Sequence, residues 1–432
     1  MIFERGPENQ YVKISRGIFR ACPFDKRRNQ QKKEERICAM RNFIAQRADV
    51  LKPSGIRKVN EKALAMERAG EKVLHFEQGR PDFDTPAYIK EAAKKALDEG
   101  DVFYTSNFGT MQLKEAIAEY LNTRKSCAYK AENILVTAGL SEAIYCVLAS
   151  ILDEGDEILV PDPVWMNYLN VPKMLGAKVV TYDLLEENDC QIDLAQLKSL
   201  VTPKTKAIVV VSPSNPTGGV LDAASLQAIA DIATQNDLLV VTDEVYERLI
   251  YDGGKHVAMA SLPGMAERTV TLNGFSKTYS MTGWRLGYVA ANADLIKTFN
   301  KIHQISSVCA PSFVQTAGVV ALKEEHGEVE EMLAEYQRRR DYAVKAINET
   351  PGLSCRVPGG AFYIFINIKE LGISSADFCQ RLLEEEKVAM VPGDVFGKNG
   401  EGYLRMSFAN SYESVVAGCE GLKRMAAKLM NK

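Results

Sequence analysis

Short apolar runs separated by helix-length stretches dominate the middle of this 432-residue chain. The runs are rich in Val, Ile and Leu, and they lie at residues 134–136, 158–160, 179–180, 208–211, 238–241 and 270–272. Strands that are buried on both faces have this composition, and helices of this length supply the connections of a parallel sheet. The pattern predicts an α/β region with a mostly parallel sheet covered by helices.

The pattern differs on both sides of this region. Before it, a helical apolar spacing at residues 59–66 ends at Gly70 and precedes a short strand at 73–76. After about residue 325 come a long charged helix, strands and a final helix to Lys432; the strands are expected at 361–366, 388–391 and 403–407. We therefore expect a large domain at 87–325 and a smaller α+β domain built from 50–86 and 326–432.

The first 49 residues form an N-terminal extension in this interpretation. Residues 1–39 carry ten Lys/Arg and five Asp/Glu, without an apolar period or a signal-peptide core. The segment reads as a disordered tail, as an organellar address, or as sequence translated ahead of a start at Met40. Its acidic residues disfavour the organellar address, because transit peptides are poor in acids. We assign no function to it.

Composition narrows the class of protein. The chain is 46% hydrophobic and 25% charged, which excludes disorder, collagen and coiled coil, and its net charge of −3 gives no case for a nucleic-acid partner. No apolar run approaches the roughly 18 residues that cross a bilayer. Nine Cys without a C-x-x-C pair suit a reducing compartment, and four His leave little material for a metal site. We expect a soluble, cytoplasmic protein of the size of an enzyme, with no metal, nucleic-acid or membrane partner.

Polar groups follow the predicted strands at the point where each strand ends. Ligands of open α/β sheets bind beyond these carboxyl ends. Asn215, Asp243 and Lys277 each come shortly after a run, and no P-loop or G-x-G-x-x-G is present. A lysine is usually a solvated surface charge, but Lys277 follows a buried-type strand among small residues. A desolvated amine there would lose proton affinity and attack carbonyls.

Residues 274–287, Gly-Phe-Ser-Lys-Thr-Tyr-Ser-Met-Thr-Gly-Trp-Arg-Leu-Gly, resemble the pyridoxal-phosphate attachment signature of class I/II aminotransferases. Further family elements follow in the same chain order: Gly-x-Pro-Asp-Phe at 79–83, Tyr104 before Gly109, Ser-Asn-Pro-Thr-Gly at 214–218, Asp243 with Tyr246, and Arg405. The resemblance spans about residues 50–430. It implies the aspartate/aromatic aminotransferase-like fold type I, a two-domain α/β homodimer with active sites at the subunit interface.

The resemblance also implies a role for each matching residue. Lys277 would hold the cofactor covalently and act as the base, with Asp243 and Tyr246 as its catalytic partners. The other cofactor contacts would come from Asn215 on the phenolate oxygen, Trp165 on the ring face, Gly139, Leu140, Ser141, Ser276 and Arg285 on the phosphate, and Tyr104 from the neighbouring subunit. The substrate would contact Gly79, Trp165, Asn215 and Arg405, whose guanidinium would grip the carboxylate. Taken singly, several have ordinary uses: Asp243 as a helix cap, Asn215 in a turn, Arg405 in a surface salt bridge.

The resemblance implies a ping-pong amino-acid aminotransferase that moves an amino group from an L-amino acid to a 2-oxo acid, for which we expect 2-oxoglutarate. The donor stays open between aspartate, aromatic and broad specificity, because Ser141 stands where some aspartate-specific relatives carry a lysine. A pyridoxal-phosphate-dependent carbon–sulfur β-lyase on the same fold is the alternative. A non-catalytic effector-binding regulator is disfavoured, since the extension is too short for a winged-helix domain.

Overall fold

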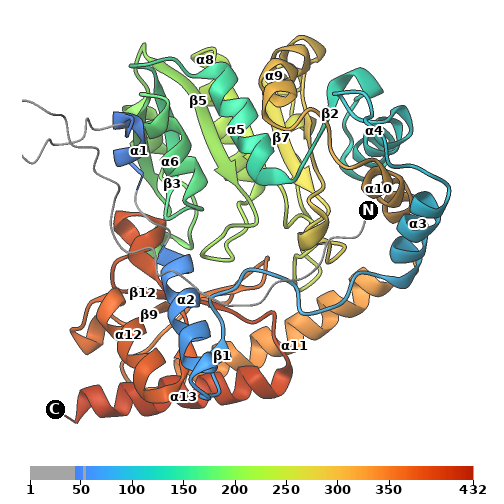
Figure 1. Ribbon diagram of the computed structural model, residues 1–432. Coiled ribbons are helices and arrows are strands. Elements are labelled where there is room, and N and C mark those ends of the chain that lie inside the picture. Colours follow the sequence, from blue (N-terminus) through green and yellow to red (C-terminus); the bar gives the residue numbers. More distant parts are fainter. Residues whose placement is uncertain (1–43, 52–54, 432) are drawn as a thin grey trace, which may run out of the picture. The chain divides into compact units, whose positions relative to one another are not determined.

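A seven-stranded sheet forms the centre of the computed structural model, which describes residues 44–51 and 55–431 (Figure 1). Its strand order is β2-β8-β7-β6-β5-β3-β4, and only β8 runs antiparallel to its neighbours. The strands are β2 (Ile134–Thr137), β3 (Glu157–Asp162), β4 (Lys178–Asp183), β5 (Thr205–Val211), β6 (Leu239–Asp243), β7 (Thr269–Gly274) and β8 (Gly287–Ala290). The predicted mostly parallel sheet is confirmed.

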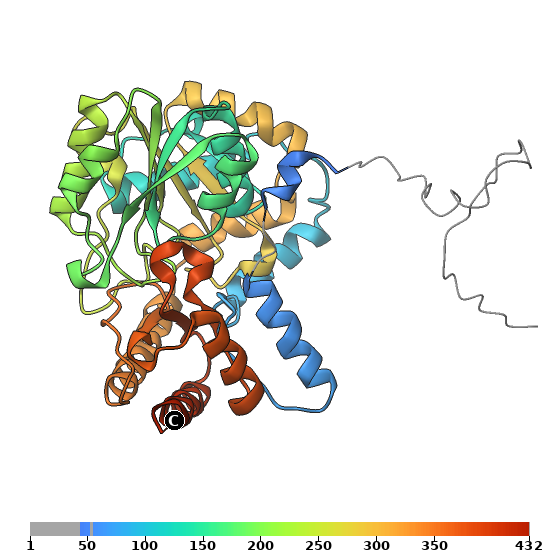
Figure 2. The same ribbon diagram turned by 90° about the vertical axis from the view of Figure 1, so that its left-hand side faces the viewer.

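Helices cover both faces of this sheet, because successive strand side chains point to opposite faces. On β3, Ile158 and Val160 pack with α5 and α9, whereas Leu159 packs with α7 and α8 on the other face. Figures 1 and 2 show these helices on the two sides of the strands. The helices of this region are α3 (Ala87–Asp98), α4 (Met111–Lys125), α5 (Leu140–Ile151), α6 (Asn167–Met174), α7 (Leu194–Leu200), α8 (Ala223–Gln235), α9 (Ala293–Ser306) and α10 (Ser312–Lys323).

Strand β8 is absent from the sequence-based expectation. Its four residues, Gly-Tyr-Val-Ala, include only one Val, Ile or Leu, so they do not stand out as an apolar run. It pairs with both β2 and β7, so that its backbone groups are satisfied by neighbours distant in sequence. The formation of β8 therefore depends on its pairing with β2 and β7, which no local pattern in its sequence indicates.

The two ends of the described chain meet in smaller sheets. β1 (Leu74–His75) pairs in parallel with β10 (Val388–Ala389), and the antiparallel order β11-β12-β9 joins Val391–Pro392, Tyr403–Ser407 and Tyr363–Asn367. The expectation of one continuous strand at 388–391 is wrong. Met390 separates two short strands that pair with different sheets, a switch that a local apolar run does not reveal.

The remaining helices are α1 (Gln46–Asp49), α2 (Gly55–Arg68), α11 (Glu328–Asn348), α12 (Ser375–Glu386) and α13 (Tyr412–Met430). The described residues from Ala45 onward form one compact unit. The interpretation of residues 1–39 lies outside the described residues, and the division at 86/87 and 325/326 stays a prediction. None of the helices described is long and apolar enough to cross a membrane.

Candidate active site

A cavity of about 380 Å³ lies where β5, β6 and β7 end and α5 begins. All predicted site residues except Gly139 and Tyr104 line it. The lining residues that we predicted are Gly79, Leu140, Ser141, Trp165, Asn215, Asp243, Tyr246, Ser276, Lys277, Arg285 and Arg405. The strand ends therefore bring together groups that lie up to 326 positions apart in the sequence.

The Lys277 amine is held inside this cavity and donates a hydrogen bond to the Gly79 carbonyl oxygen. It also lies 5.6 Å from the centre of the Phe362 ring and 5.8 Å from that of Tyr246. Burial, together with the positive charges of Arg405 and Arg285, lowers the pKa of this amine to about 8. A larger share of Lys277 is therefore unprotonated and nucleophilic near neutral pH than for an ordinary lysine.

Asp243, the last residue of β6, has a buried carboxylate. Its Oδ2 accepts a hydrogen bond of 2.8 Å from the Tyr168 hydroxyl, and its Oδ1 accepts one of 3.2 Å from the Val245 amide. Burial raises the pKa of the carboxyl to about 6, although both hydrogen bonds favour the ionised form. The carboxylate is thus ionised at neutral pH and poised to pair with a cation that enters the cavity.

Arg405 projects a buried guanidinium from β12, with only 1% of the residue exposed. Its Nη1 donates to Asn215 Oδ1 at 3.1 Å and its Nη2 to the Glu77 carbonyl oxygen at 2.6 Å, while its Nε has no hydrogen-bond partner. Among the residues that the structure describes, no carboxylate forms an ion pair with it. Burial lowers the pKa of this guanidinium, which reflects the cost of holding an unneutralised charge. An anionic ligand that binds this guanidinium would neutralise its charge and so offset the cost of its burial.

Two tyrosines form one wall of the cavity. The hydroxyls of Tyr246 and Tyr363 lie 2.8 Å apart, and burial raises the pKa of both phenols. Gly79 has to be a glycine beside them, because a Cβ at this position would collide with the Tyr363 hydroxyl. The Tyr363 ring also lies 4.5 Å below the guanidinium carbon of Arg405, and supports it by a cation–π contact.

Anion-binding groups gather at the start of α5. The first ladder bonds of this helix go from Glu142 and Ala143 to the Gly139 carbonyl, so that the amides of Leu140 and Ser141 precede the ladder. Arg285 donates to the Thr282 carbonyl at 2.9 Å, and in the described part of the chain it forms no ion pair. Gly139 does not line the cavity, but its φ of +88° and its closeness to Arg285 exclude a side chain there. A helix N-terminus beside a guanidinium that has no carboxylate partner among the described residues is a suitable site for a phosphate.

Tyr104 stands apart from this group. It is 86% exposed and, with Val102 and Phe103, borders a different hollow beside Cys309 and Phe313. The structure therefore does not bring Tyr104 to the cavity of its own chain. Its role in a neighbouring subunit's site stays a prediction.

Two contributors escaped the sequence analysis. Tyr168 lies three residues after Trp165, at the start of α6, and its spacing could have indicated that it faces the same way. Tyr363 lies on β9, where neighbouring strand positions face opposite ways, but nothing local indicates that it contacts Tyr246, 117 positions earlier. Only the packing of β9 against the cavity reveals it.

Comparison with known proteins agrees with this geometry. The family model of aminotransferase class I and II matches residues 71–419. The chain belongs to this family, whose members are generally dependent on pyridoxal phosphate, and it is therefore an enzyme that transfers amino groups. The predicted family and fold class are confirmed.

Individual relatives extend over nearly the whole described chain. The aspartate aminotransferase of Pyrococcus abyssi is 44% identical over 392 residues, which cover 90% of this chain and 99% of that protein. Aromatic-amino-acid aminotransferase 2 of Thermococcus litoralis is 41% identical, again with 90% and 99% covered. Among solved structures, the Thermus thermophilus aspartate aminotransferase with maleate has a TM-score of 0.85 at 34% identity, covering 88% of this chain and 99% of its own.

The raised pKa of Asp243 predicts how stability changes with pH. A carboxyl with a pKa of about 6 in the folded protein and about 4 when unfolded stabilises the fold at low pH, and that contribution is lost as pH rises through about 6. We expect Asp243→Asn to raise the free energy of unfolding of the ligand-free protein by about 3 kcal/mol at pH 7.5, but little at about pH 4. Urea unfolding at both pH values measures this; an equal effect at both would contradict the assignment.

Proposed function

We propose that this chain is a pyridoxal-phosphate-dependent aminotransferase that moves an amino group from an L-amino acid to a 2-oxo acid. The observation that carries the proposal is the buried guanidinium of Arg405, without a carboxylate partner, in the same cavity as the Lys277 amine. A cationic clamp and a nucleophilic amine in one enclosed space suit a substrate with a carboxylate and a carbonyl or amino group on adjacent carbons.

The donor set fits the cofactor. The phosphate would bind the amides of Leu140 and Ser141 at the start of α5, together with Arg285, which lies beside Ala138, and Ser276, which also lines the cavity. Trp165 lines the cavity with a partly buried ring that offers a stacking surface. Since Arg285 has no acidic partner in the described residues, a phosphate would neutralise it without displacing an existing ion pair.

The cofactor supplies an aldehyde that condenses with primary amines and a pyridinium ring that withdraws electrons from the substrate α-carbon. The Asp243 carboxylate would pair with the ring nitrogen and keep it protonated by its negative charge. The Lys277 amine would hold the cofactor covalently before the substrate binds, and would then accept the proton from the substrate α-carbon and donate it to the cofactor. A pKa near 8 suits an amine that both accepts and donates a proton close to neutral pH.

Arg405 and Asn215 set the orientation of the substrate. The guanidinium would bind the α-carboxylate through two parallel hydrogen bonds, which fixes the amino acid and aligns its α-hydrogen for removal. Tyr246 and Asn215 would donate to the cofactor's phenolate oxygen from the cavity wall. These roles require the three side chains to face the same space, and Arg405, Asn215 and Tyr246 all line the cavity.

For the donor, we propose aspartate, an aromatic amino acid, or both, because the relatives include proteins named for each. Ser141 carries no positive charge that could bind the second carboxylate of aspartate. This favours a broad donor specificity over one restricted to aspartate. 2-Oxoglutarate is the proposed acceptor. We place the enzyme in the cytoplasm, consistent with free thiols at all cysteines in the described residues.

We also propose a homodimer in which Tyr104 completes the phosphate site of the neighbouring subunit. Val102, Phe103 and Tyr104 are 58%, 79% and 86% exposed, and they form an apolar patch that we call the 102–104 patch. Large apolar side chains exposed side by side favour a protein partner. A second copy of the chain would cover them.

A substrate screen tests the proposed function. The purified protein with pyridoxal phosphate should form glutamate from 2-oxoglutarate with aspartate or aromatic donors, and borohydride reduction followed by peptide mapping should label Lys277. Release of pyruvate and ammonia from cystathionine, without glutamate formation, would instead favour the β-lyase. Label on another residue would refute the role of Lys277.

Arg405→Ala should lower kcat/KM for amino acids by about 10²–10³, because the substrate carboxylate would lose its buried, charge-assisted partner. The cofactor should stay bound, as judged by the visible absorbance of the protein. Arg405→Lys should restore part of the activity, since it keeps the charge but not the bidentate geometry. Loss of the cofactor from Arg405→Ala would contradict the assignment to the substrate.

Phe103→Asp should convert the dimer to a monomer in light scattering coupled to size exclusion, and should weaken cofactor retention if Tyr104 acts across the interface. Met430→Asp is the matched control, because Met430 is also exposed, at 56%, but lies at the end of α13. A wild-type protein that is monomeric at micromolar concentration would exclude the shared site.

A further inference from the structure

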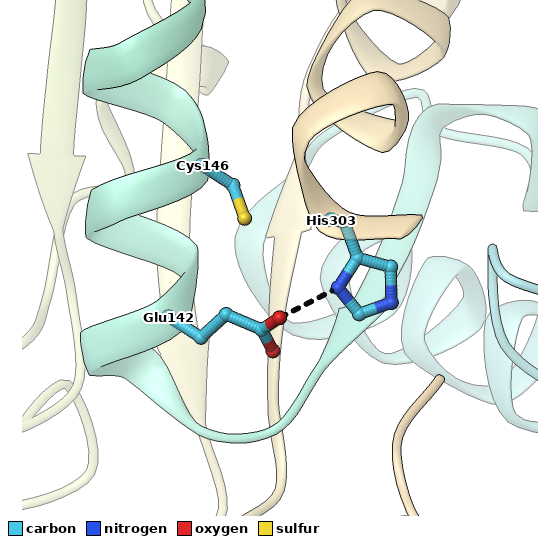
Figure 3. A group of neighbouring side chains, drawn as sticks. All are labelled: Glu142, Cys146 and His303. Carbon is cyan, nitrogen blue, oxygen red and sulfur yellow. Dashed lines mark hydrogen bonds and ion pairs between the residues drawn. The ribbon is translucent and has the colours of Figure 1, made fainter. Parts of the chain in front are cut away.

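The start of α5 is tied to the end of α9 through a single carboxylate, that of Glu142 (Figure 3). Its Oε1 accepts hydrogen bonds from His303 Nδ1 at 2.9 Å, from Ser306 Oγ at 2.7 Å and from Ser307 Oγ. Its Oε2 accepts one of 2.6 Å from the Ala138 amide. We call Glu142, His303, Ser306 and Ser307 the Glu142 clamp.

The clamp is complete without a metal ion. Glu142, Cys146 and His303 place possible ligand atoms within 4.8 Å of one another. However, Glu142 Oε1 already accepts three hydrogen bonds, and the Cys146 sulfur lies 3.9 Å from Ser306 Oγ. Although burial opposes ionisation, the donors hold the pKa of Glu142 at about 2, so that it stays a carboxylate throughout the working pH range.

Ala138 is held through both of its backbone polar groups, which belong to the two peptide groups on either side of its Cα. The Ala138 carbonyl oxygen accepts a long hydrogen bond of 3.5 Å from Arg285 Nη2, while the Ala138 amide donates to Glu142. The next residues are Gly139, whose φ is +88°, and then Leu140 and Ser141, whose amides precede the helical ladder. Glu142 itself does not line the cavity, so it would influence a ligand there through the backbone of Ala138 and the residues that follow it.

We propose that Glu142, held by His303 and the two serines, is a positioning residue that fixes the Ala138–Gly139 turn so that the following amides meet the phosphate of the cofactor. A glycine turn has many alternative conformations, and a carboxylate with four donors restricts them before the ligand arrives. The inference rests on the proposed cofactor, but it concerns only the phosphate end of the site. The aldehyde end depends on Lys277, which the clamp does not touch.

The test compares pyridoxal phosphate with pyridoxal, which lacks the phosphate. For Glu142→Ala, we expect the apparent Kd of pyridoxal phosphate to rise at least about tenfold and that of pyridoxal to change by less than about twofold. Visible absorbance during titration of the cofactor-free protein measures both. Inorganic phosphate, used as a competitor, should also lose affinity for the variant.

Two further variants guard against a purely structural effect. Glu142→Gln should recover most of the affinity, since its amide oxygen can still accept from Ala138, and Cys146→Ser should leave both constants unchanged. An equal loss for both aldehydes, or no loss for either, overturns the positioning role. If Glu142→Ala does not fold, His303→Ala, which removes the Nδ1 donor to Glu142, carries the same comparison. Wild-type protein that captures neither aldehyde refutes the proposed function. The role of Glu142 is then decided by binding of inorganic phosphate measured directly by calorimetry, which should be weaker in Glu142→Ala than in the wild type.

Discussion

The active site depends on buried charges that the protein does not neutralise by itself. Arg405 donates to a carbonyl and an amide oxygen, Lys277 donates to a carbonyl, and Asp243 accepts from a phenol and an amide. Each group is hydrogen-bonded, which keeps the cost of burial tolerable, but within residues 44–51 and 55–431 none of them has an oppositely charged side chain in direct contact. The site therefore lacks charge partners that a carboxylate, a pyridinium and a phosphate would provide. The same unneutralised charges would then supply both the affinity for the ligands and the groups that react with them.

The central sheet makes this arrangement possible. Because β5, β6 and β7 run parallel, their carboxyl ends deliver groups to one edge without any strand having to bend. The core on the two faces holds the strand ends rigidly, and β12 adds Arg405 from a separate antiparallel sheet. Asp243 and Arg405 lie on strands, and Lys277 lies in the turn directly after β7, so that short connections to the sheet would limit the motion of these groups.

The site also costs stability. Asp243 and Lys277 both have pKa values displaced toward neutrality by burial, and such displacement measures the free energy with which the fold resists their charged forms. Ordinary polar or apolar side chains of similar size would be more stable there. The proposed reaction requires these charged groups, and this requirement would account for their retention despite the cost in stability.

Local patterns in the sequence determined a large part of this protein. The apolar runs predicted six of the sheet strands and their mostly parallel order, because strands buried on both faces are rich in Val, Ile and Leu. The motif around Lys277 indicated the family, since its small residues, lysine and arginine stand at fixed spacings. The polar residues at the strand ends were predicted as site residues for the same reason, and all but Gly139 and Tyr104 line one cavity.

Tertiary structure decided what depends on contacts between distant segments. The strand β8, the split at Met390, the hydrogen bond from Tyr168 to Asp243 and the Tyr246–Tyr363 pair all join residues whose proximity no local pattern encodes. Likewise, Glu142 reads as an ordinary acidic residue in the first turn of a helix until α9 is packed beside it. The physical reason is that apolar periodicity records which face of an element is buried, whereas hydrogen-bond partners are chosen only when those faces come together.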